Sequence, residues 1–291
     1  MAVPQRQVPG VYHRRVGDIV VTCVSDGYLD GSMAVIQNIP AEEAAQMLRD
    51  AFRPVPRRTA VNTFLIHSAG RIALVDTGCG SAMAATGGQL PANLAAAGIA
   101  PAQIDTVLLT HMHPDHSNGL ADAAGNRLFP NAELVMHAAE LAFWHDDAAM
   151  ARADETSRQR NFQAARDQAA PYRDRSRTFE GGEVFPGVTA MHFPGHTPGH
   201  TGYMIASGGE TLLIWGDIIH VPEIQIPRPE VTMAFDIDPR QAEATRRRVF
   251  DMVATDKLAF AGMHMHFPGL GHLVRRDGGY AVVPEAWSGA M

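Results

Sequence analysis

The sequence is short of cysteine and of long apolar runs, and each shortage excludes a class of protein. Its two cysteines, Cys23 and Cys79, are too few for a disulfide framework and lack the C-x-x-C spacing of a redox motif. No segment approaches the roughly 20 apolar residues that a membrane-spanning helix requires, and residues 1–10 show no signal-peptide pattern. We therefore expect reduced cysteines, a cytoplasmic location and no membrane partner.

Charge is also scarce. Only 19% of the 291 residues are charged, the formal net charge is −7, and the one basic run is Arg246 to Arg248. A protein of this kind has no electrostatic surface with which to hold the phosphates of a nucleic acid. We expect no nucleic-acid partner and a small substrate that is uncharged or weakly charged.

What the sequence has in quantity is apolar residues, at 46% of the chain, enough to bury a substantial core. Short β-like runs alternate with amphipathic stretches, and no Ser/Gly/Pro-rich linker divides them, which indicates a layered α/β protein. The expected strands lie at Asp18–Ser25, Val61–His67, Arg71–Asp76, Thr106–Thr110, Ala132–His137, Val188–Phe193, Gly202–Ala206, Thr211–Trp215 and Lys257–Ala261. The expected helices lie at Ala41–Phe52, Leu90–Ala97, Ala138–Asp146, Glu155–Ala169 and Pro239–Val253.

The hexapeptide from His111 to His116, of sequence HMHPDH, places four metal-capable side chains within six residues. It follows directly on the apolar run that ends at Thr110, so it falls where a strand ends and a loop begins. Imidazole and carboxylate groups at this density serve little purpose in packing. The hexapeptide therefore predicts a metal centre.

Three later segments supply further donors. His196 and His200 lie in a turn built from two Pro-Gly pairs, and Asp217 ends an apolar strand, where one carboxylate can bridge two cations. His264 and His266 are two residues apart, so on an extended backbone they point to the same side. Both can reach the site, and the residues alone do not choose between them.

The number and type of donors favour a two-metal hydrolytic site over a structural zinc. A structural zinc takes four closed ligands that are usually rich in cysteine, whereas here histidine and aspartate dominate and the donors exceed four. Imidazole with carboxylate suits zinc, and also iron, manganese or cobalt. We expect two divalent ions, zinc before the others.

These motifs, in this order along the chain, resemble the signature of the metallo-β-lactamase superfamily. The likeness rests on HMHPDH, on the segment GHTPGH that ends at His200, on Gly216-Asp217 and on a late histidine, and it runs from about Gly17 to Val283. Within the superfamily the sequence most resembles methyl parathion hydrolase and related lactonases. The resemblance implies a four-layer αββα sandwich, with residues 1–10 as a flexible tail and residues 11–291 as a single hydrolase domain.

The resemblance also implies a role for each donor. The first metal would be held by His111, His113 and His196, the second by Asp115, His116 and His264, and Asp217 would bridge them. His264 is preferred over His266 because the following Phe-Pro-Gly segment aligns with the family's late motif. A hydroxide bridging the metals would attack a lactone, an aryl ester or an organophosphate triester.

Two residues carry further catalytic hypotheses. Asp115 would relay a proton to the leaving group from its place on the second metal. His220 stands where related lactonases have a tyrosine, so we expect it to face the pocket and to donate a hydrogen bond to substrate; a paired, non-catalytic imidazole is the alternative. His200 is expected to support the turn instead of binding metal.

The substrate pocket can be outlined only by likeness and by sequence order. Trp144 matches an aromatic that lines the pocket in methyl parathion hydrolase, and Phe162, Ile219 and Met233 are further candidates, although their spacing also suits core packing. An apolar wall over a metal centre would suit a neutral substrate.

Other functions remain open at this stage. A mononuclear iron dioxygenase or a thioesterase of the same superfamily would use a subset of these ligands, and a non-catalytic metal-dependent binding module would keep them without turnover. The resemblance makes a homodimer our expectation.

Overall fold

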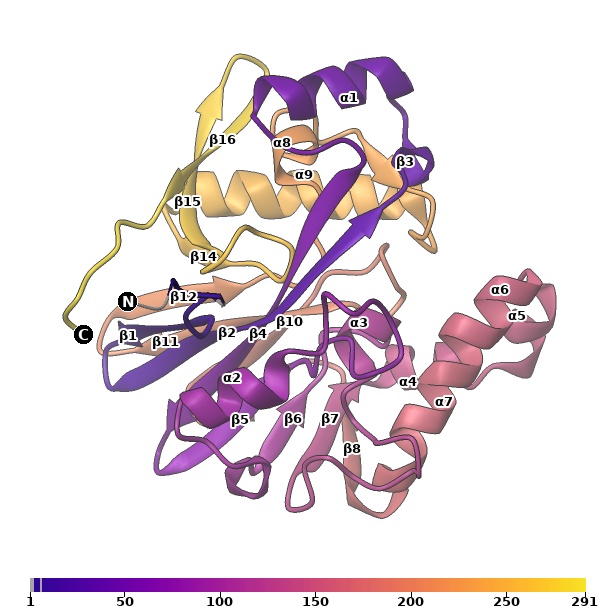
Figure 1. Ribbon diagram of the computed structural model, residues 1–291, viewed down its shortest axis with the longest axis vertical. Helices are drawn as coiled ribbons and strands as arrows, with labels where there is room; N and C mark the ends of the chain where they lie inside the picture. The colour runs from indigo at the N-terminus through magenta and orange to yellow at the C-terminus, as the bar shows by residue number, and fades with distance from the viewer. Residues whose placement is uncertain (1–2, 6) are drawn as a thin grey trace.

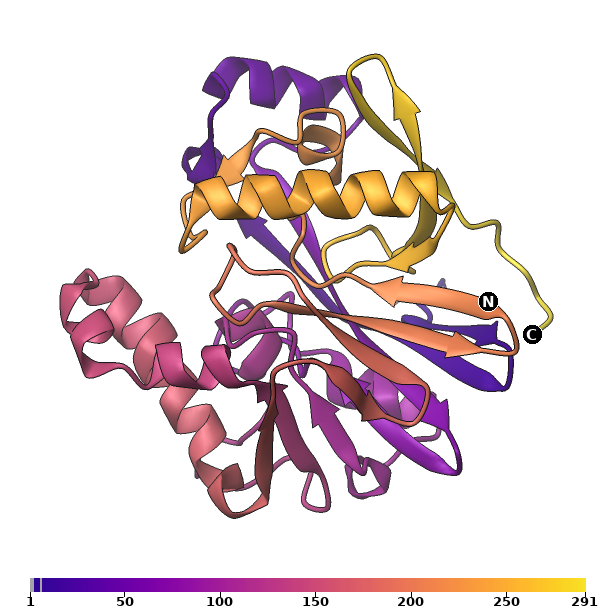
Figure 2. The same ribbon diagram turned by 180° about the vertical axis from the view of Figure 1, so that it is seen from behind.

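Two β-sheets packed face to face, with helices on their outer surfaces, form the frame of the protein (Figures 1 and 2). A computed structural model describes residues 3–5 and 7–291. Within the predicted tail, residues 1, 2 and 6 lie outside the described residues, while residues 3–5 and 7–10 form no helix or strand. The two termini lie on the same side of the molecule in Figure 1.

The first sheet is built from the amino-terminal half of the chain, in the order β1-β2-β4-β5-β6-β7-β8. Its strands are β1 Val11–Val16, β2 Ile19–Gly31, β4 Arg57–Ser68, β5 Arg71–Val75, β6 Thr106–Leu108, β7 Glu133–His137 and β8 Ser176–Phe179. The β1, β2, β4 and β5 neighbours are antiparallel, and from β5 to β8 the strands run parallel.

The second sheet comes from the carboxyl-terminal half, in the order β16-β15-β14-β12-β11-β10-β9. Its strands are β9 Gly182–Phe185, β10 Val188–His192, β11 Thr201–Ser207, β12 Glu210–Ile214, β14 Ala259–Ala261, β15 Leu270–Arg276 and β16 Gly279–Pro284. Strand β12 is parallel to β14 and antiparallel to β11, which is antiparallel to β10, so β10, β12 and β14 all point the same way.

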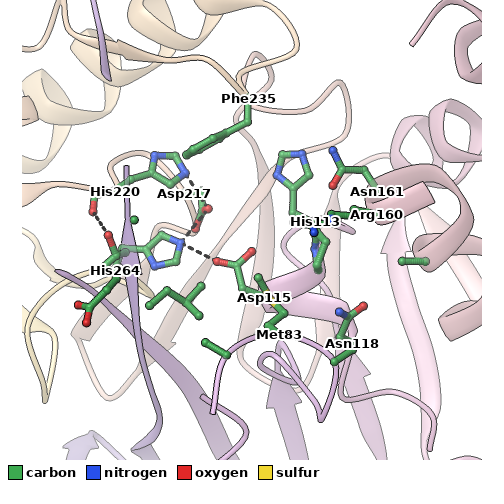
Figure 3. A pocket seen from close by; sticks show the side chains of 18 of the residues that line it. Met83, His113, Asp115, Asn118, Arg160, Asn161, Asp217, His220, Phe235 and His264 are labelled. Atoms are coloured by element: carbon green, nitrogen blue, oxygen red, sulfur yellow. Dashed lines mark hydrogen bonds and ion pairs between the residues drawn. The ribbon is translucent and has the colours of Figure 1, made fainter. Parts of the chain in front are cut away.

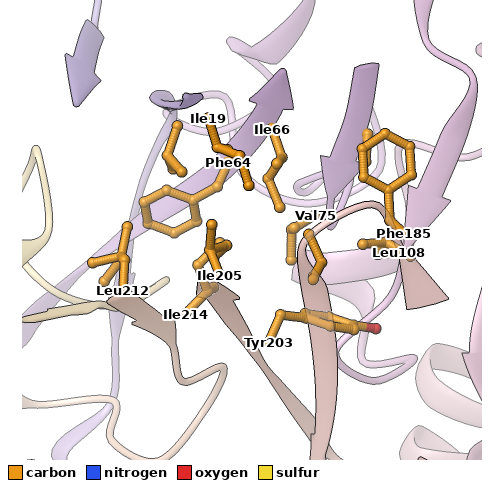
Figure 4. Close-up of a cluster of buried hydrophobic side chains, with 14 of the residues drawn as sticks. Ile19, Phe64, Ile66, Val75, Leu108, Phe185, Tyr203, Ile205, Leu212 and Ile214 are labelled. Atoms are coloured by element: carbon orange, nitrogen blue, oxygen red, sulfur yellow. The ribbon is translucent and has the colours of Figure 1, made fainter. Parts of the chain in front are cut away.

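Alternation along the strands sends one set of side chains between the sheets and the other set outward. Phe64 and Ile66 of β4 join Ile205 and Ile214 of the second sheet in the central core (Figure 4). Leu65, between the two β4 residues, faces the helices instead.

The helices cover the outer faces and complete the predicted four-layer αββα sandwich, which is confirmed. They are α1 Ala41–Asp50, α2 Leu90–Ala96, α3 Pro114–Ser117, α4 Ala138–Trp144, α5 Asp147–Arg152, α6 Glu155–Ser157, α7 Ala164–Ala169, α8 Pro222–Gln225 and α9 Pro239–Thr255. Shorter 3-10 segments are η1 Met33–Val35, η2 Pro101–Gln103 and η4 Ala170–Arg175, and η3 Arg158–Gln163 is a π-helix. Helices α2, α4 and α7 pack on the first sheet, and α9 packs on the second. No helix in the described part of the chain is long and apolar enough to cross a membrane.

The expected elements are present, with two differences. The expected helix Glu155–Ala169 is interrupted by the π-helix, whose wider turn places one extra residue on the side of the helix. Strands β1, β8, β9, β15 and β16 were not expected. Four of them, β1, β8, β9 and β16, are edge strands that are largely solvent-accessible and lack a sustained apolar pattern, and β15 lies next to the edge strand β16.

Candidate metal centre

The predicted donors lie in four loops that follow four strands. The loop after β6 carries the HMHPDH hexapeptide, and the loops after β10, β12 and β14 carry His196, Asp217 and His264. Because β10, β12 and β14 point the same way, their carboxyl ends meet at one edge of the second sheet, opposite the end of β6. The fold thus brings together residues up to 153 positions apart in the sequence.

His111, His113 and His196 form what we call the three-histidine group. The Nε2 atom of His111 lies 3.1 Å from Nδ1 of His113, and Nε2 of His196 lies 2.9 Å from that same Nδ1 and 3.1 Å from Nε2 of His111. All three rings are buried. Three ring nitrogens that converge in this way offer the donors that a transition-metal ion prefers.

Asp217 lies at the centre of the site. Its Oδ2 atom is 2.9 Å from Nε2 of His220 and 3.0 Å from Nε2 of His264. The Nε2 atoms of His116, His196 and His111 follow at 3.2, 3.4 and 3.7 Å. One buried carboxylate oxygen cannot accept hydrogen bonds from five imidazoles, so the arrangement fits an oxygen that ligates cations.

Asp115, His116 and His264 form the acid-containing group. The Oδ2 atom of Asp115 lies 3.4 Å from Nε2 of His264 and 3.6 Å from Nε2 of His116. His266 does not join this group: its Nε2 atom lies 2.5 Å from Oε1 of Glu223, and its side chain is partly exposed. Of the two late histidines, the structure places His264 in the cluster.

Buried polar atoms without partners support a metal-binding function. Nε2 of His116 and Oδ1 of Asp217 are inaccessible to solvent and have no hydrogen-bond partner within the described residues, a costly arrangement unless a ligand meets them. Burial, with the neighbouring imidazoles, holds the pKa of His111 and His113 well below the usual value. Neutral imidazole is the form that binds metal.

The acidic residues have the opposite effect on their neighbours. Burial would lower the pKa of His116, but Asp217, Asp115 and Asp76 raise it well above its usual value. Burial likewise works to raise the pKa of Asp217, yet the surrounding imidazoles hold it well below the usual range. The carboxylate is therefore ionised at neutral pH, which is the form that ligates metal.

Three of these histidines have a partner at the other ring nitrogen that fixes the orientation of the imidazole. Nδ1 of His116 lies 2.8 Å from Oδ2 of Asp76, and Nδ1 of His196 lies 2.7 Å from Oδ1 of Asp236. Nδ1 of His264 donates to the carbonyl of Ala60 at 2.7 Å. Asp236 was not expected from the sequence, because no motif marks it.

His200 supports Asp217, in keeping with the supporting role expected of it. Its Nε2 atom accepts the backbone N–H of Asp217 at 2.7 Å, and its Nδ1–H donates to the carbonyl of Phe193 at 2.9 Å. Gly216 has φ of +65°, and a Cβ atom there would lie 2.4 Å from His200 Nε2, so the Gly-Asp pair leaves room for this contact.

Glu140 joins the two loops of the three-histidine group and was also missed. Its Oε1 atom accepts the backbone N–H of Met112 at 2.8 Å and the indole N–H of Trp144 at 2.6 Å. Its Oε2 atom accepts the Thr197 hydroxyl at 2.6 Å and the Gly199 N–H at 3.0 Å. An acid inside the apolar segment AAELAFW was the only sequence signal.

A cleft of about 690 Å³ opens onto the centre, a size that suits a small molecule (Figure 3). His113, Asp115, Asp217, His220 and His264 form its floor. The His220 ring packs against Phe235 at 4.8 Å between centroids, and burial lowers its pKa to about 4. His220 thus faces the cleft as expected, and its place beside Asp217 and His196 makes it a further candidate ligand.

The prediction of the residues that form the pocket wall was wrong. Trp144 and Phe162 are buried between the first sheet and its helices, Ile219 packs under α9, and Met233 packs between α1 and α8. None of the four lines the cleft, because each apolar side chain gains more by joining a core than by facing water. Trp144 still contacts the site indirectly, through Glu140 and an edge contact with the His113 ring.

The family model for the metallo-beta-lactamase superfamily matches residues 56–264. The chain belongs to this superfamily. The matched segment includes every donor of both groups and ends at His264. The protein is a metal-dependent hydrolase, like the members of the superfamily that have this site. The prediction of a metal-dependent hydrolase is therefore confirmed.

Two solved structures of the superfamily have closely similar folds. The hydrolase AbOPH is 32% identical, with a TM-score of 0.91 over 97% of this chain and 100% of its own. AidC, described as a dizinc quorum-quenching lactonase and solved in complex with a product, is 26% identical, with a TM-score of 0.91 over 96% and 99% of the two chains.

One curated relative has a different described activity. The atrochrysone carboxyl ACP thioesterase of Passalora fulva is 28% identical over 212 residues, which are 71% of this chain and 54% of that protein. The chain thus matches about half the length of this relative.

Proposed function

We propose that the protein binds two divalent metal ions, zinc first, and hydrolyses a lactone or an aryl ester. The proposal rests on Asp217, whose Oδ2 atom lies within 3.7 Å of five imidazole nitrogens and between the two donor groups. Two ions bound in those groups would polarise the substrate carbonyl and lower the pKa of a water molecule. The dizinc site described for AidC supports this reading.

The chain's own residues would divide the remaining work. The three-histidine group and the acid-containing group hold the ions, and Asp217 joins them. Asp115, at the cleft side of the site, is placed to pass a proton to the leaving group. His220, a neutral imidazole on the cleft floor, would donate a hydrogen bond to the substrate oxygen.

The substrate class is supported by the cleft and by the relatives. Leu29, Met83 and Phe235 give the cleft an apolar part beside the polar floor, which suits an acyl or aryl group. The lactonase AidC has a fold that matches over nearly the whole chain. Organophosphate triesters enter the test only because the sequence motifs resemble those of methyl parathion hydrolase.

A thioester is the second candidate substrate, because the Passalora fulva relative is described as a thioesterase. The attack on a thioester carbonyl needs the same metal centre. The two candidates differ only in the leaving group that the cleft must accommodate.

A substrate panel on metal-replete protein tests the proposal. An aryl ester, an N-acyl homoserine lactone, a dialkyl aryl phosphate and an acyl thioester would be compared, with metal content measured on the same sample. Two equivalents of metal with lactone or aryl-ester turnover are expected. One equivalent of iron with oxygen uptake would contradict the proposal, and two metals without any turnover would favour a binding module.

The expected homodimer remains a prediction. Light scattering of the purified protein would give twice the mass of 31.4 kDa if it is correct.

A further inference from the structure

Arg57 is a buried arginine that the protein leaves without a charged partner. It begins β4, lines the cleft, and is only 9% exposed. Its Nη1 donates to the hydroxyl of Thr59, but Nε has no partner, and no carboxylate of the described residues lies within 4 Å of the guanidinium. Burying a cation in this way is costly unless something else meets it.

A second buried arginine shows what a structural guanidinium looks like in this fold. Arg246 of α9 is 1% exposed, and it donates to the carbonyls of Ile218, Pro229 and Val231 at 2.7 to 2.8 Å. Arg246 lies away from the cleft and its donors are used by the protein itself. Arg57 faces the cleft and keeps donors free.

The backbone around Arg57 leaves space for the guanidinium. Gly31 pairs with Arg57 across β2 and β4, and a Cβ atom at Gly31 would lie 2.8 Å from Nη2 and 2.9 Å from Cζ. Thr59, which accepts from Nη1, lies 3.4 Å from the carbonyl of His220. The guanidinium is therefore held on the same wall of the cleft as His220, beside the metal centre.

The charges that line the cleft leave Arg57 available. Asp30 is paired with Arg58 at 2.8 Å, and Asp115 and Asp217 belong to the metal centre. On the opposite wall the π-helix places Arg160 at the cleft, exposed and without a hydrogen-bond or ion-pair partner within the described residues (Figure 3). Apart from these three aspartates, the charged side chains that line the cleft are the two arginines, Arg57 and Arg160.

We propose that Arg57 is a specificity-determining residue that binds a carboxylate on the substrate, remote from the bond that is cleaved. The charge of a guanidinium is delocalised over its three nitrogens, so a carboxylate in the cleft can pair with Arg57 although Nε itself is inaccessible to solvent. The substrate is then an acidic ester or lactone, and not the neutral molecule that an apolar pocket wall would suit. This inference rests on the proposed hydrolase function for its kinetic test.

The experiment compares two esters of equal chain length on zinc-replete protein, mono-4-nitrophenyl adipate and 4-nitrophenyl hexanoate. We expect wild type to prefer the acidic ester. Arg57→Gln should lower kcat/KM for that ester by about 10- to 100-fold, mainly through KM, while the neutral ester changes by less than about threefold. Arg57→Lys should restore part of the loss, since it keeps the charge but not the planar fork.

Two further variants separate recognition from folding. Arg58→Gln removes the neighbouring exposed arginine on the same strand and should leave both esters unchanged. Gly31→Ala keeps Arg57 but displaces its guanidinium, and should lower kcat/KM for the acidic ester alone. The melting temperature and zinc content of Arg57→Gln should not fall, because the variant removes an unpaired buried charge.

Calorimetry with the monoamide of adipate and with neutral hexanamide provides a test without turnover, because only the first of these amides carries a carboxylate. Wild type should bind the adipate monoamide more tightly than hexanamide, and Arg57→Gln should abolish that difference. If neither ester is hydrolysed but binding of the adipate monoamide still depends on Arg57, the hydrolase proposal fails and this one stands. Equal losses on both esters in Arg57→Gln, or binding of the adipate monoamide no tighter than that of hexanamide, would overturn it.

Discussion

The three-histidine group and the acid-containing group meet at Asp217, yet they are built differently. His111, His113 and His196 are all buried, and burial holds the pKa of His111 and His113 well below the usual value. Glu140 connects the two loops that carry them. In the acid-containing group the Asp115 side chain is 18% exposed and faces the cleft. Its histidines have raised pKa values, because Asp217 and Asp115 lie beside them.

This difference separates two tasks that a hydrolytic centre must perform. A closed set of buried imidazole donors fixes the position of an ion, since packing orients the rings and the hydrogen bond with Asp236 also holds His196. A group that includes an accessible carboxylate brings charge and proton transfer to the side where substrate enters. We therefore expect the first group to act mainly in metal retention and the second mainly in turnover.

The largest effect is expected when the residue that contacts both donor groups, Asp217, is replaced. Asp217→Asn should lower kcat/KM by at least about 1,000-fold and reduce the bound zinc, because the neutral amide cannot bridge two cations. Zinc content and ester hydrolysis would be measured on the same sample. Asp167→Asn, at an exposed position on α7, is the matched control. Full activity in Asp217→Asn would rule out its bridging role.

His220 tests whether the cleft floor acts in turnover or in metal retention. If it donates a hydrogen bond to the substrate oxygen, His220→Ala should lower kcat by about 100-fold while two zinc ions stay bound. Loss of one zinc would instead make it a ligand, as its 2.9 Å distance from Asp217 permits. Unchanged kcat and KM would leave it without a catalytic role.

The two supporting acids sharpen the comparison one group at a time. Asp236→Asn weakens the hold on His196 of the three-histidine group, and Asp76→Asn does the same for His116 of the acid-containing group. Each should lower the affinity for one zinc ion by about 10- to 100-fold. Zinc titration followed by competition with a chelator would show one weakened site in each variant.

The order of activity loss is the discriminating result for this pair. Asp76→Asn should lose turnover at limiting zinc before Asp236→Asn does, if the acid-containing group serves the substrate. Identical titration curves for the two variants would mean that the groups are not separate sites.

Short sequence motifs predicted most residues of the candidate metal centre, but the residues expected to form the cleft wall do not line the cleft. HMHPDH, GHTPGH and the Gly-Asp pair at Asp217 are short motifs at strand ends, so both their chemistry and their place in the fold were readable. Asp236 and Glu140 act through contacts with residues 40 and 57 positions away along the chain, and no local pattern records such contacts.

The prediction of the cleft wall was wrong for a related reason. A large apolar residue such as Trp144 has the same appearance in sequence whether it faces a core or a cleft, and packing decides between them. The sequence did not predict a role for Arg57, because that role depends on the absence of a hydrogen-bond partner for its Nε atom, which is evident only in the folded structure. The π-helix that brings Arg160 to the cleft likewise follows no apolar period.

The smallest expected effect concerns the turn that carries His264. Burial alone would raise the pKa of Glu223, but its hydrogen bonds with His266 and Arg53 hold the pKa below the usual value of 4.5. A lowered folded-state pKa adds stability above pH 4.5, and that stability is lost as the pH falls through the folded-state value. Glu223→Gln should therefore reduce the free energy of unfolding by about 1 kcal/mol near pH 6, and by less below pH 4.5. Urea unfolding at the two pH values, with the exposed Glu210→Gln as control, measures this effect. A difference that grows on acidification would show that Glu223 does not hold the turn through its charge.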